Sequence, residues 1–189
     1  LEDNALLKFD RVSCIYFNRP ATFVPTLLYD PSKKEKYLKQ NVRLYAQFII
    51  AEDNSINKKI KILHQVLLSE QEIFNKLYSN ITFSHYTKVL YNYLYREAKS
   101  KSGIVMYLHL QDDFFDVMVF EAEQLLLYNS YPYKNEGEFL YFSLAVSEEL
   151  SVSQEQLSIV FLGKYNRYER YYKALENYKQ KLEFNNEDE

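Results

Sequence analysis

The residues best suited to chemistry in this chain are three aspartates that follow a histidine. Asp112, Asp113 and Asp116 lie close behind His109 at the end of an apolar run. Carboxylate oxygens hold Mg²⁺ in sites that catalyse phosphoryl transfer, so this cluster could bind a divalent metal. Aspartate is also a common turn residue, and strands need polar ends. We favour the turn and assign no metal ligand.

Folding explains the other reactive side chains more simply than catalysis does. Cys14 lies in the apolar run VSCIYF with no activating base nearby, which favours a buried strand and a small apolar residue over a nucleophile. His64, His85 and His109 are far apart and lack ligand spacing, so we interpret each as a hydrogen-bonded structural histidine. The sequence contains no nucleophile elbow, Walker loop or Cys-x-x-Cys pair. We therefore assign no catalytic residue.

The C-terminal part of the chain interleaves tyrosines with basic residues, a pattern that can stack bases and neutralise phosphates. Tyr168, Tyr171 and Tyr178 nevertheless fall, with Leu175 and Leu182, at helical spacing. We therefore expect these side chains to pack in a core or an interface. The last residues, EFNNEDE, predict a frayed and solvated end.

The segment Gly103–Tyr133 must position the acidic cluster. It holds three apolar runs separated by two acidic connections, and each run is too short for an ordinary helix, which predicts an antiparallel meander. A helix over 138–150, capped by Asn135 and Glu138, a strand over 157–162 and a closing helix follow. The order β-β-β-α-β-α is typical of an actin-like, or RNase H-like, α/β domain in which helices pack on a mixed sheet.

The first half of the chain predicts a different sequence of elements. A capping box, Ser69 with Glu72, should start a helix with Ile73, Phe74 and Leu77 facing inward. The remaining predicted elements are a strand over 12–17, a helix over 31–42, strands over 45–51, 60–67 and 81–83, and a helix over 85–98.

Both halves contain a strand followed by a connection and a helix. This similarity suggests a duplicated fold whose first copy is incomplete and lacks the opening meander. The polar stretch KSKSG is the expected boundary. It divides the chain into a first actin-like lobe at 1–101 and a second at 102–189.

Composition narrows the classes of partner. A hydrophobic content of 47% is enough for a real core, and the net charge of -3 with scattered lysines and arginines gives no footprint for nucleic acid or for a membrane surface. No apolar run approaches the roughly 20 residues that span a bilayer. A single cysteine suits a reducing compartment. We expect a cytoplasmic protein whose partner is another protein, not a membrane, a nucleic acid or a small molecule. Because the chain starts at Leu1, we expect its native N-terminus to lie outside it.

The motifs TFVPTLLYD, SHY before a long helix, NSYPYKNEGEFLYFSL and VFLGKY occur in an order that resembles a family of uncharacterised bacterial proteins, known mainly from Bacteroidetes, with an actin-like ATPase fold. The chain is more distantly similar to the actin-like proteins of type IV pilus assembly and cell division. In those proteins Asp-x-Gly-x-x-x-Thr cradles phosphate, and paired glycines after a later strand receive the nucleotide.

This chain departs from that nucleotide-binding pattern. Aligning HLQDDFF on the phosphate motif puts His109 in place of the metal-linked aspartate, Gln111 in place of glycine and Phe115 in place of threonine. At the later strand only Gly163 remains. Phosphate needs a close approach to the backbone, which glycine permits and a side chain obstructs. The resemblance therefore implies a degenerate nucleotide site at positions His109, Gln111, Asp112, Gly163 and Lys164.

Three functions remain open on the sequence alone. We favour a non-catalytic, actin-like scaffold or protein-interaction module, a pseudoenzyme without a cofactor. The first alternative is a nucleotide-binding ATPase that holds ATP and Mg²⁺ through unconventional contacts from Lys164 and Arg167. The second is a metal-dependent RNase H-like nuclease that uses Asp112 and Asp116.

Overall fold

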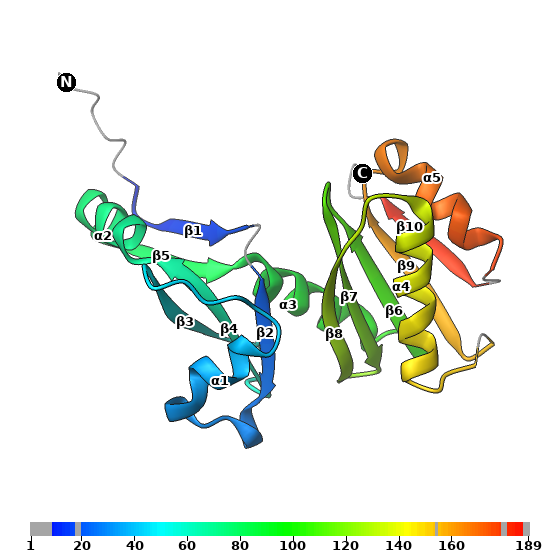
Figure 1. The fold of residues 1–189 in the computed structure, drawn as a ribbon, viewed down its shortest axis with the longest axis horizontal. Helices are drawn as coiled ribbons and strands as arrows, with labels where there is room; N and C mark the ends of the chain where they lie inside the picture. The colour runs from blue at the N-terminus through cyan, green and yellow to red at the C-terminus, as the bar shows by residue number, and fades with distance from the viewer. Residues whose placement is uncertain (1–8, 18–19, 154, 179–180, 187–189) are drawn as a thin grey trace. The chain divides into compact units, whose positions relative to one another are not determined.

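The chain forms a mixed α/β structure with two compact units, seen in a computed structural model that describes residues 9–17, 20–153, 155–178 and 181–186 (Figure 1). The units are Leu1–Asn92 and Tyr93–Glu189, and the division falls inside helix α3 (Tyr86–Ala98). Among the described residues, every helix is too short or too polar to span a lipid bilayer.

The division inside α3 lies earlier than the expected boundary between residues 101 and 102. Tyr95 donates a hydrogen bond to Glu123, and Tyr93 accepts one from Asn185, both within the second unit. The last turns of α3 therefore belong to the second unit. A polar stretch marks where a helix stops, whereas packing decides where a unit starts. The assignment of two actin-like lobes stays a prediction.

The second unit contains a five-stranded sheet in the order β10-β9-β6-β7-β8. The predicted meander is confirmed, because β6 pairs antiparallel with β7 and β7 antiparallel with β8, while β9 runs parallel to β6. The elements are β6 (Ile104–Leu110), β7 (Phe114–Glu121), β8 (Gln124–Pro132), α4 (Glu136–Glu149), β9 (Leu157–Gly163), α5 (Tyr165–Glu176) and β10 (Leu182–Asn186).

The predicted frayed end is wrong for residues 183–186, because Leu182–Asn186 forms β10 and pairs parallel with β9. Residues 187–189 of that prediction lie outside the described residues. The apolar side chains of β10 supply the reason. The ring of Phe184 stacks on that of Phe161, with centroids 6.0 Å apart, and also contacts Tyr165 and Tyr172. Two apolar residues among polar neighbours are enough to dock an edge strand on an existing sheet.

Helices α4 and α5 pack on one face of this sheet. Phe139 and Val146 of α4 and Tyr171 and Leu175 of α5 are buried in one core with alternate residues of the central strands, such as Leu108. The opposite face is buried as well. Asn135 caps α4, as its spacing predicts. Tyr168 and Tyr171 of α5 face the core as predicted. Tyr178 does not, because it lies beyond the helix and is 52% exposed.

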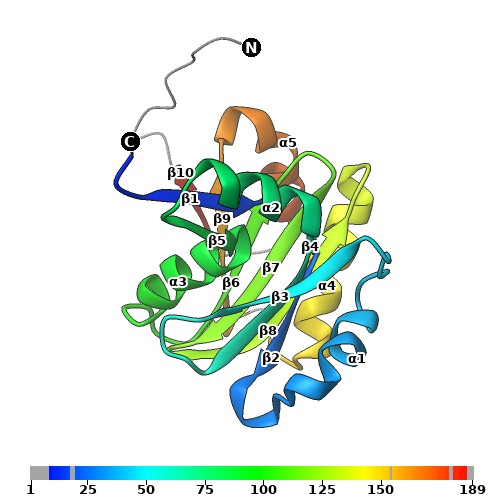
Figure 2. The same cartoon turned by 90° about the vertical axis from the view of Figure 1, so that its left-hand side faces the viewer.

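The first unit contains two smaller sheets (Figure 2). Strand β4 lies between β2 and β3 with antiparallel pairing, and β1 pairs parallel with β5. The elements are β1 (Val12–Tyr16), β2 (Ala21–Pro25), two 3₁₀ turns (Thr26–Leu28 and Pro31–Lys33), α1 (Lys34–Lys39), β3 (Phe48–Asn54), β4 (Ile60–Leu67), α2 (Leu68–Leu77) and β5 (Ile81–His85).

Helix α2 and strand β1 differ from the predictions. The capping box is wrong: β4 runs directly into α2, so Leu67 is the N-cap and Ser69 lies within the first turn. Ile73 and Leu77 are exposed rather than inward. The strand that contains Cys14 is only partly buried, because alternate residues face outward.

Replacing Phe139 with alanine should lower the free energy of unfolding by about 3–5 kcal/mol. The ring is fully buried and contacts the rings of Phe115, Tyr133 and Phe161. Tyr141→Ala on the same helix is the matched control, since that side chain is 68% exposed, and it should change stability by less than about 0.5 kcal/mol. Chemical denaturation followed by circular dichroism measures both variants. Equal losses would contradict the assignment of Phe139 to the core.

Candidate functional site

Two turns of the second unit emerge at the same edge of its sheet. Because β6 and β9 are parallel and end at Leu110 and Gly163, the segments that follow them lie next to each other. In open α/β sheets this carboxyl edge is where ligands commonly bind. The turn 111–113 and the residue Lys164 are also where the sequence predicts degenerate nucleotide-site positions.

A single tyrosine spans the two turns. Gly163 has a φ of +126°, a backbone conformation suited to glycine. A β-carbon at this position would lie 3.5 Å from the ring of Tyr168 and 3.8 Å from the carbonyl oxygen of Leu110. The hydroxyl of the same tyrosine donates to Asp112 Oδ1 at 3.4 Å. Tyr168 therefore lies over the backbone that a phosphate would have to approach.

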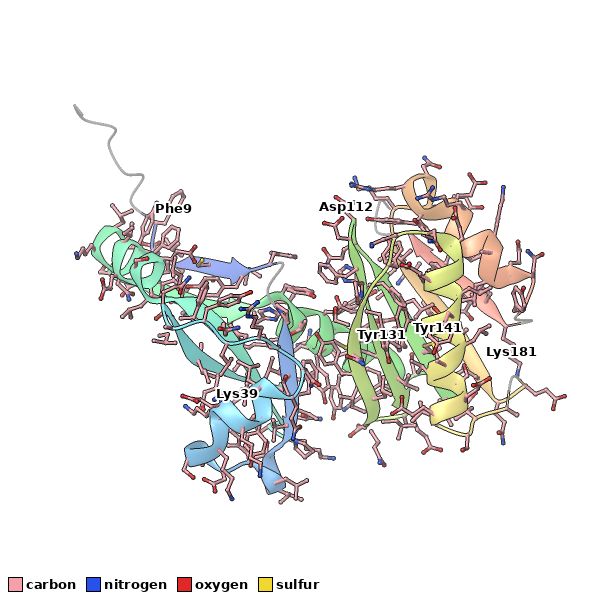
Figure 3. All side chains as sticks on the ribbon, in the orientation of Figure 1. Phe9, Lys39, Asp112, Tyr131, Tyr141 and Lys181 are labelled. Atoms are coloured by element: carbon pink, nitrogen blue, oxygen red, sulfur yellow. The ribbon has the colours of Figure 1, made fainter. Side chains whose placement is uncertain are left out.

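An ion pair joins the same two turns. The Arg167 guanidinium contacts the carboxylate of Asp112 and lies 5.7 Å from the centroid of the Tyr168 ring. Asp112 lies at the tip of its turn (Figure 3). Both charged side chains are largely exposed, so we expect the pair to add no more than about 1 kcal/mol of stability. Burial raises the pKa of the Tyr168 hydroxyl, which keeps it a neutral hydrogen-bond donor.

Behind the first turn, His109 and Asp116 lie opposite each other on β6 and β7. His109 Nδ1 is 3.4 Å from Asp116 Oδ2, and Tyr128 donates to the other carboxylate oxygen at 3.4 Å. Gln111 Nε2 lies 3.5 Å from His109 Nδ1, and the Gln111 carbonyl accepts the hydroxyl proton of Tyr133. The predicted hydrogen bond of His109 is confirmed. These contacts hold the turn in place from within the protein.

The predicted acidic cluster is split between different surroundings. Asp112 is exposed and paired with Arg167, whereas Asp116 is 1% exposed and lies within β7. Asp113 lines a separate pocket. Within the described ranges, no group of three or more histidines, cysteines, aspartates and glutamates is arranged to hold a metal ion.

Lys164 contributes to this site through its backbone. It is the N-cap of α5, and its carbonyl oxygen accepts the N–H groups of Arg167 and Tyr168 at 3.0 and 3.2 Å. Sequence reasoning assigned Tyr168 to packing, which is confirmed by its 9% exposure, but missed that its hydroxyl reaches Asp112. A nucleotide-site role for the five predicted positions stays a prediction.

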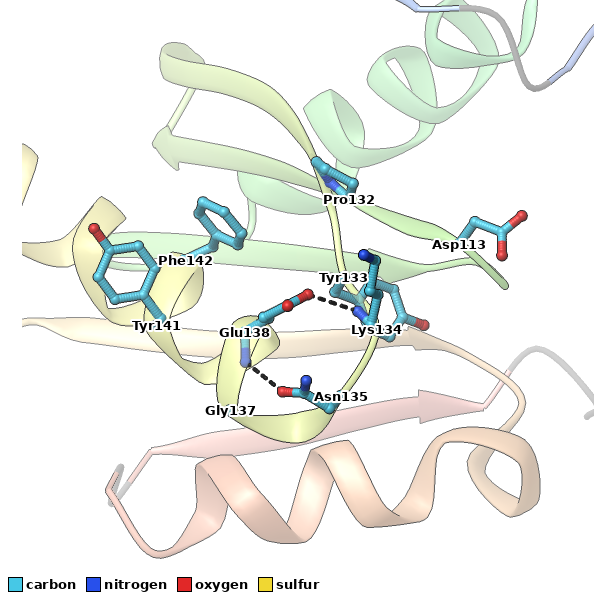
Figure 4. Close-up of a pocket in the computed structure, with 9 residues that line it drawn as sticks. All are labelled: Asp113, Pro132, Tyr133, Lys134, Asn135, Gly137, Glu138, Tyr141 and Phe142. Carbon is cyan, nitrogen blue, oxygen red and sulfur yellow. Dashed lines mark hydrogen bonds between the residues drawn. The ribbon is translucent and has the colours of Figure 1, made fainter.

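An open pocket of about 760 Å³ lies beside the N-terminus of α4 (Figure 4). Asn135 Oδ1 accepts the Glu138 N–H, and the Glu138 carboxylate accepts the Lys134 N–H, both at 2.9 Å. The capping side chains therefore already occupy donors that an anion would need. The pocket escaped sequence analysis because residues from separate elements line it: Asp113, Pro132, Tyr133, Lys134, Asn135, Gly137, Glu138, Tyr141 and Phe142.

A buried polar cluster in the first unit was also missed. Asp53 accepts the His85 N–H at 2.8 Å and the Lys88 ammonium at 2.9 Å, and His85 Nδ1 is 2.7 Å from the Thr87 hydroxyl. The His64 ring, 2% exposed, lies 4.9 Å from that of His85. The predicted hydrogen bond is confirmed for His85.

Two solved structures show which fold this chain resembles. A Bacteroides thetaiotaomicron protein with this fold and unknown function aligns with a TM-score of 0.87 and 20% identity, over 97% of this chain and 72% of its own. A structure of the PilM–PilN type IV pilus biogenesis complex aligns with a TM-score of 0.51 and 10% identity, over 93% of this chain and 69% of its own. At these identities the likeness shows the fold alone.

Residues 2–182 match the family described as "Protein of unknown function (DUF3822)", and the chain belongs to that family. The resemblance inferred from the sequence, to an uncharacterised family with an actin-like ATPase fold and to a pilus assembly protein, is confirmed. No functionally curated protein matches the chain.

The free energy of unfolding should fall as the pH drops from about 6.5 towards 4. Burial lowers the pKa of His64 from 6.5 to about 4, so the unfolded chain takes up a proton in this range that the folded chain does not. The loss between pH 7 and 5 should be about 2 kcal/mol. Glu52, whose pKa the Tyr29 hydrogen bond lowers from 4.5 to about 2, acts only at lower pH.

Denaturant unfolding of the chain and of a His64→Phe variant across this pH range measures the effect. The variant keeps a ring at the buried position but cannot titrate, so its stability should vary less with pH. Parallel curves for the two proteins would show that His64 is not the group responsible.

Proposed function

We propose that this chain is a non-catalytic actin-like module that works by binding another protein. The observation that carries the proposal is the closure of the carboxyl edge by the protein's own side chains. Tyr168 reaches from Gly163 to Asp112, and Arg167 pairs with the same carboxylate.

This arrangement is poorly suited to a nucleoside triphosphate. Phosphate binding in such folds relies on converging backbone N–H groups and on local positive charge. Here the first turn presents the side chain of Gln111 and the carboxylate of Asp112, which would repel phosphate. At the second turn the aromatic ring of Tyr168 lies over Gly163.

The nucleotide-binding alternative needs Arg167 to leave Asp112, with which it is paired. The nuclease alternative needs Asp112 and Asp116 to share a metal ion. Asp116 is buried against His109 and Tyr128, whereas Asp112 is exposed in the turn. Both alternatives therefore require rearrangements of contacts that the described residues already make.

A solved chain of the same fold is consistent with that role. The pilus structure is a complex of PilM with PilN, so an actin-like fold can serve to hold a second protein. The identity of 10% transfers neither partner to this chain.

We also infer that the two units are copies of one fold and that the first copy is incomplete. The parallel pair β1 and β5 corresponds to the parallel pair β9 and β10. In the second unit, the other edge of β9 pairs with β6 of the meander. The matching edge of β1 pairs with no strand among the described residues, which supports a first copy without a meander.

Titrating Mg·ATP into the chain in a calorimeter should give a Kd weaker than about 1 mM, equivalent to a binding free energy of no more than about 4 kcal/mol. The physical reason is the loss of accessible backbone donors at both turns. Mg·ADP should behave in the same way. Micromolar binding of either nucleotide would overturn the proposal and favour the ATPase alternative.

A further inference from the structure

A groove of about 800 Å³ lies between α1 and β3 in the first unit. One wall carries four lysines and one glutamate, and the other carries three apolar residues of β3: Lys33, Lys34, Lys36, Lys39 and Glu35 against Phe48, Ile49 and Ile50. Ile49 is 39% exposed although it is a large apolar residue in a strand. The groove therefore combines positive charge with an apolar wall.

Strand β3 is an edge strand of its sheet. It pairs with β4 on one side, and within the described residues no strand pairs with its other side. Helix α1 packs chiefly on β2 and β4, where Leu38 is buried against Val24 and Leu63. Ile50 of β3 packs against the same cluster, so what remains open at β3 is the outer edge that pairs with no strand among the described residues. An edge strand offers unpaired N–H and C=O groups to which an extended chain can add.

The charges of the groove are only partly neutralised. Lys33 pairs with Asp30, and Lys34 pairs with Glu52, both at 2.9 Å. Lys39 contacts Glu35 one turn earlier in the same exposed helix, a weak kind of pair. Lys36 is exposed and forms no ion pair within the part of the chain that the structure describes. Positive charge therefore remains beside the strand on a chain whose net charge is -3.

Building on the proposed protein-binding role, we propose that this groove binds an extended acidic segment of a partner protein, which adds a strand to the edge of β3. Successive side chains of a strand point to opposite faces of a sheet. Acidic residues on the face next to α1 would meet Lys36 and Lys39, and apolar residues on the opposite face would lie beside Ile49. The recognised pattern is therefore an alternation of acidic and apolar residues.

A nucleic-acid strand matches this groove less well. Its phosphates could meet the lysines, but it has no peptide groups with which to pair the edge of β3. Main-chain pairing with β3 therefore distinguishes a peptide ligand from a nucleic-acid ligand. A single-stranded oligonucleotide serves as the competing probe.

The test uses the full chain and a capped, fluorescent peptide of the length of β3 that alternates aspartate with valine. The control peptide carries lysine in place of aspartate. The double variant Lys36→Glu, Lys39→Glu should weaken binding of the acidic peptide about tenfold or more. Lys59→Glu, Lys76→Glu makes the same charge change at exposed positions of the first unit outside the groove, and it should weaken binding less than about twofold.

Hydrogen exchange on the complex checks the mode of binding. The amides of residues 49–54 that point away from β4 should exchange more slowly when the acidic peptide is bound. The proposal is overturned if the acidic peptide binds no better than its lysine counterpart, if both double variants lose equal affinity, if β3 gains no protection, or if the oligonucleotide binds the groove more tightly. The peptide experiments test the groove, and the Mg·ATP titration tests the proposed function. A groove that binds no peptide and a chain that binds nucleotide are therefore distinguishable results.

Discussion

The parallel pairing of β6 with β9 is the constraint on which the candidate site depends. It brings the turn after Leu110 and the turn after Gly163 to one edge of the sheet, although they are far apart in sequence. A single side chain, Tyr168, can then contact both turns. This carboxyl edge, where ligands commonly bind in open α/β sheets, is thus covered by an aromatic ring and an ion pair.

Local pattern was enough to predict most of the second unit, from the meander to α5. The three apolar runs between acidic connections form β6, β7 and β8, and Asn135 caps α4 as its spacing indicates. Patterns failed where long-range packing decides. Strand β10 is held by aromatic contacts of Phe184, and the contact of Tyr168 with Asp112 joins residues 56 positions apart. The burial of the His64 ring likewise depends on how β4 lies in the fold, which no local spacing encodes.

The two proposals concern different units and different physics. The closed edge is the carboxyl edge of the sheet in the second unit, where side chains cover the backbone of the two turns. The groove between α1 and β3 belongs to the first unit, where the outer edge of β3 pairs with no strand among the described residues. The proposed lack of nucleotide binding at the carboxyl edge and the proposed peptide binding in the groove therefore involve different residues.

The three glycines of the chain allow a direct test of the closed edge. Labelling glycine alone with ¹⁵N should give one amide signal each for Gly103, Gly137 and Gly163, and a Tyr168→Ala variant identifies the signal that senses the ring. Addition of millimolar Mg·ATP should leave the Gly163 signal in place, because Tyr168 and the Asp112–Arg167 pair cover that backbone. A shift of Gly163 that saturates with nucleotide, while Gly103 stays fixed, would contradict the account.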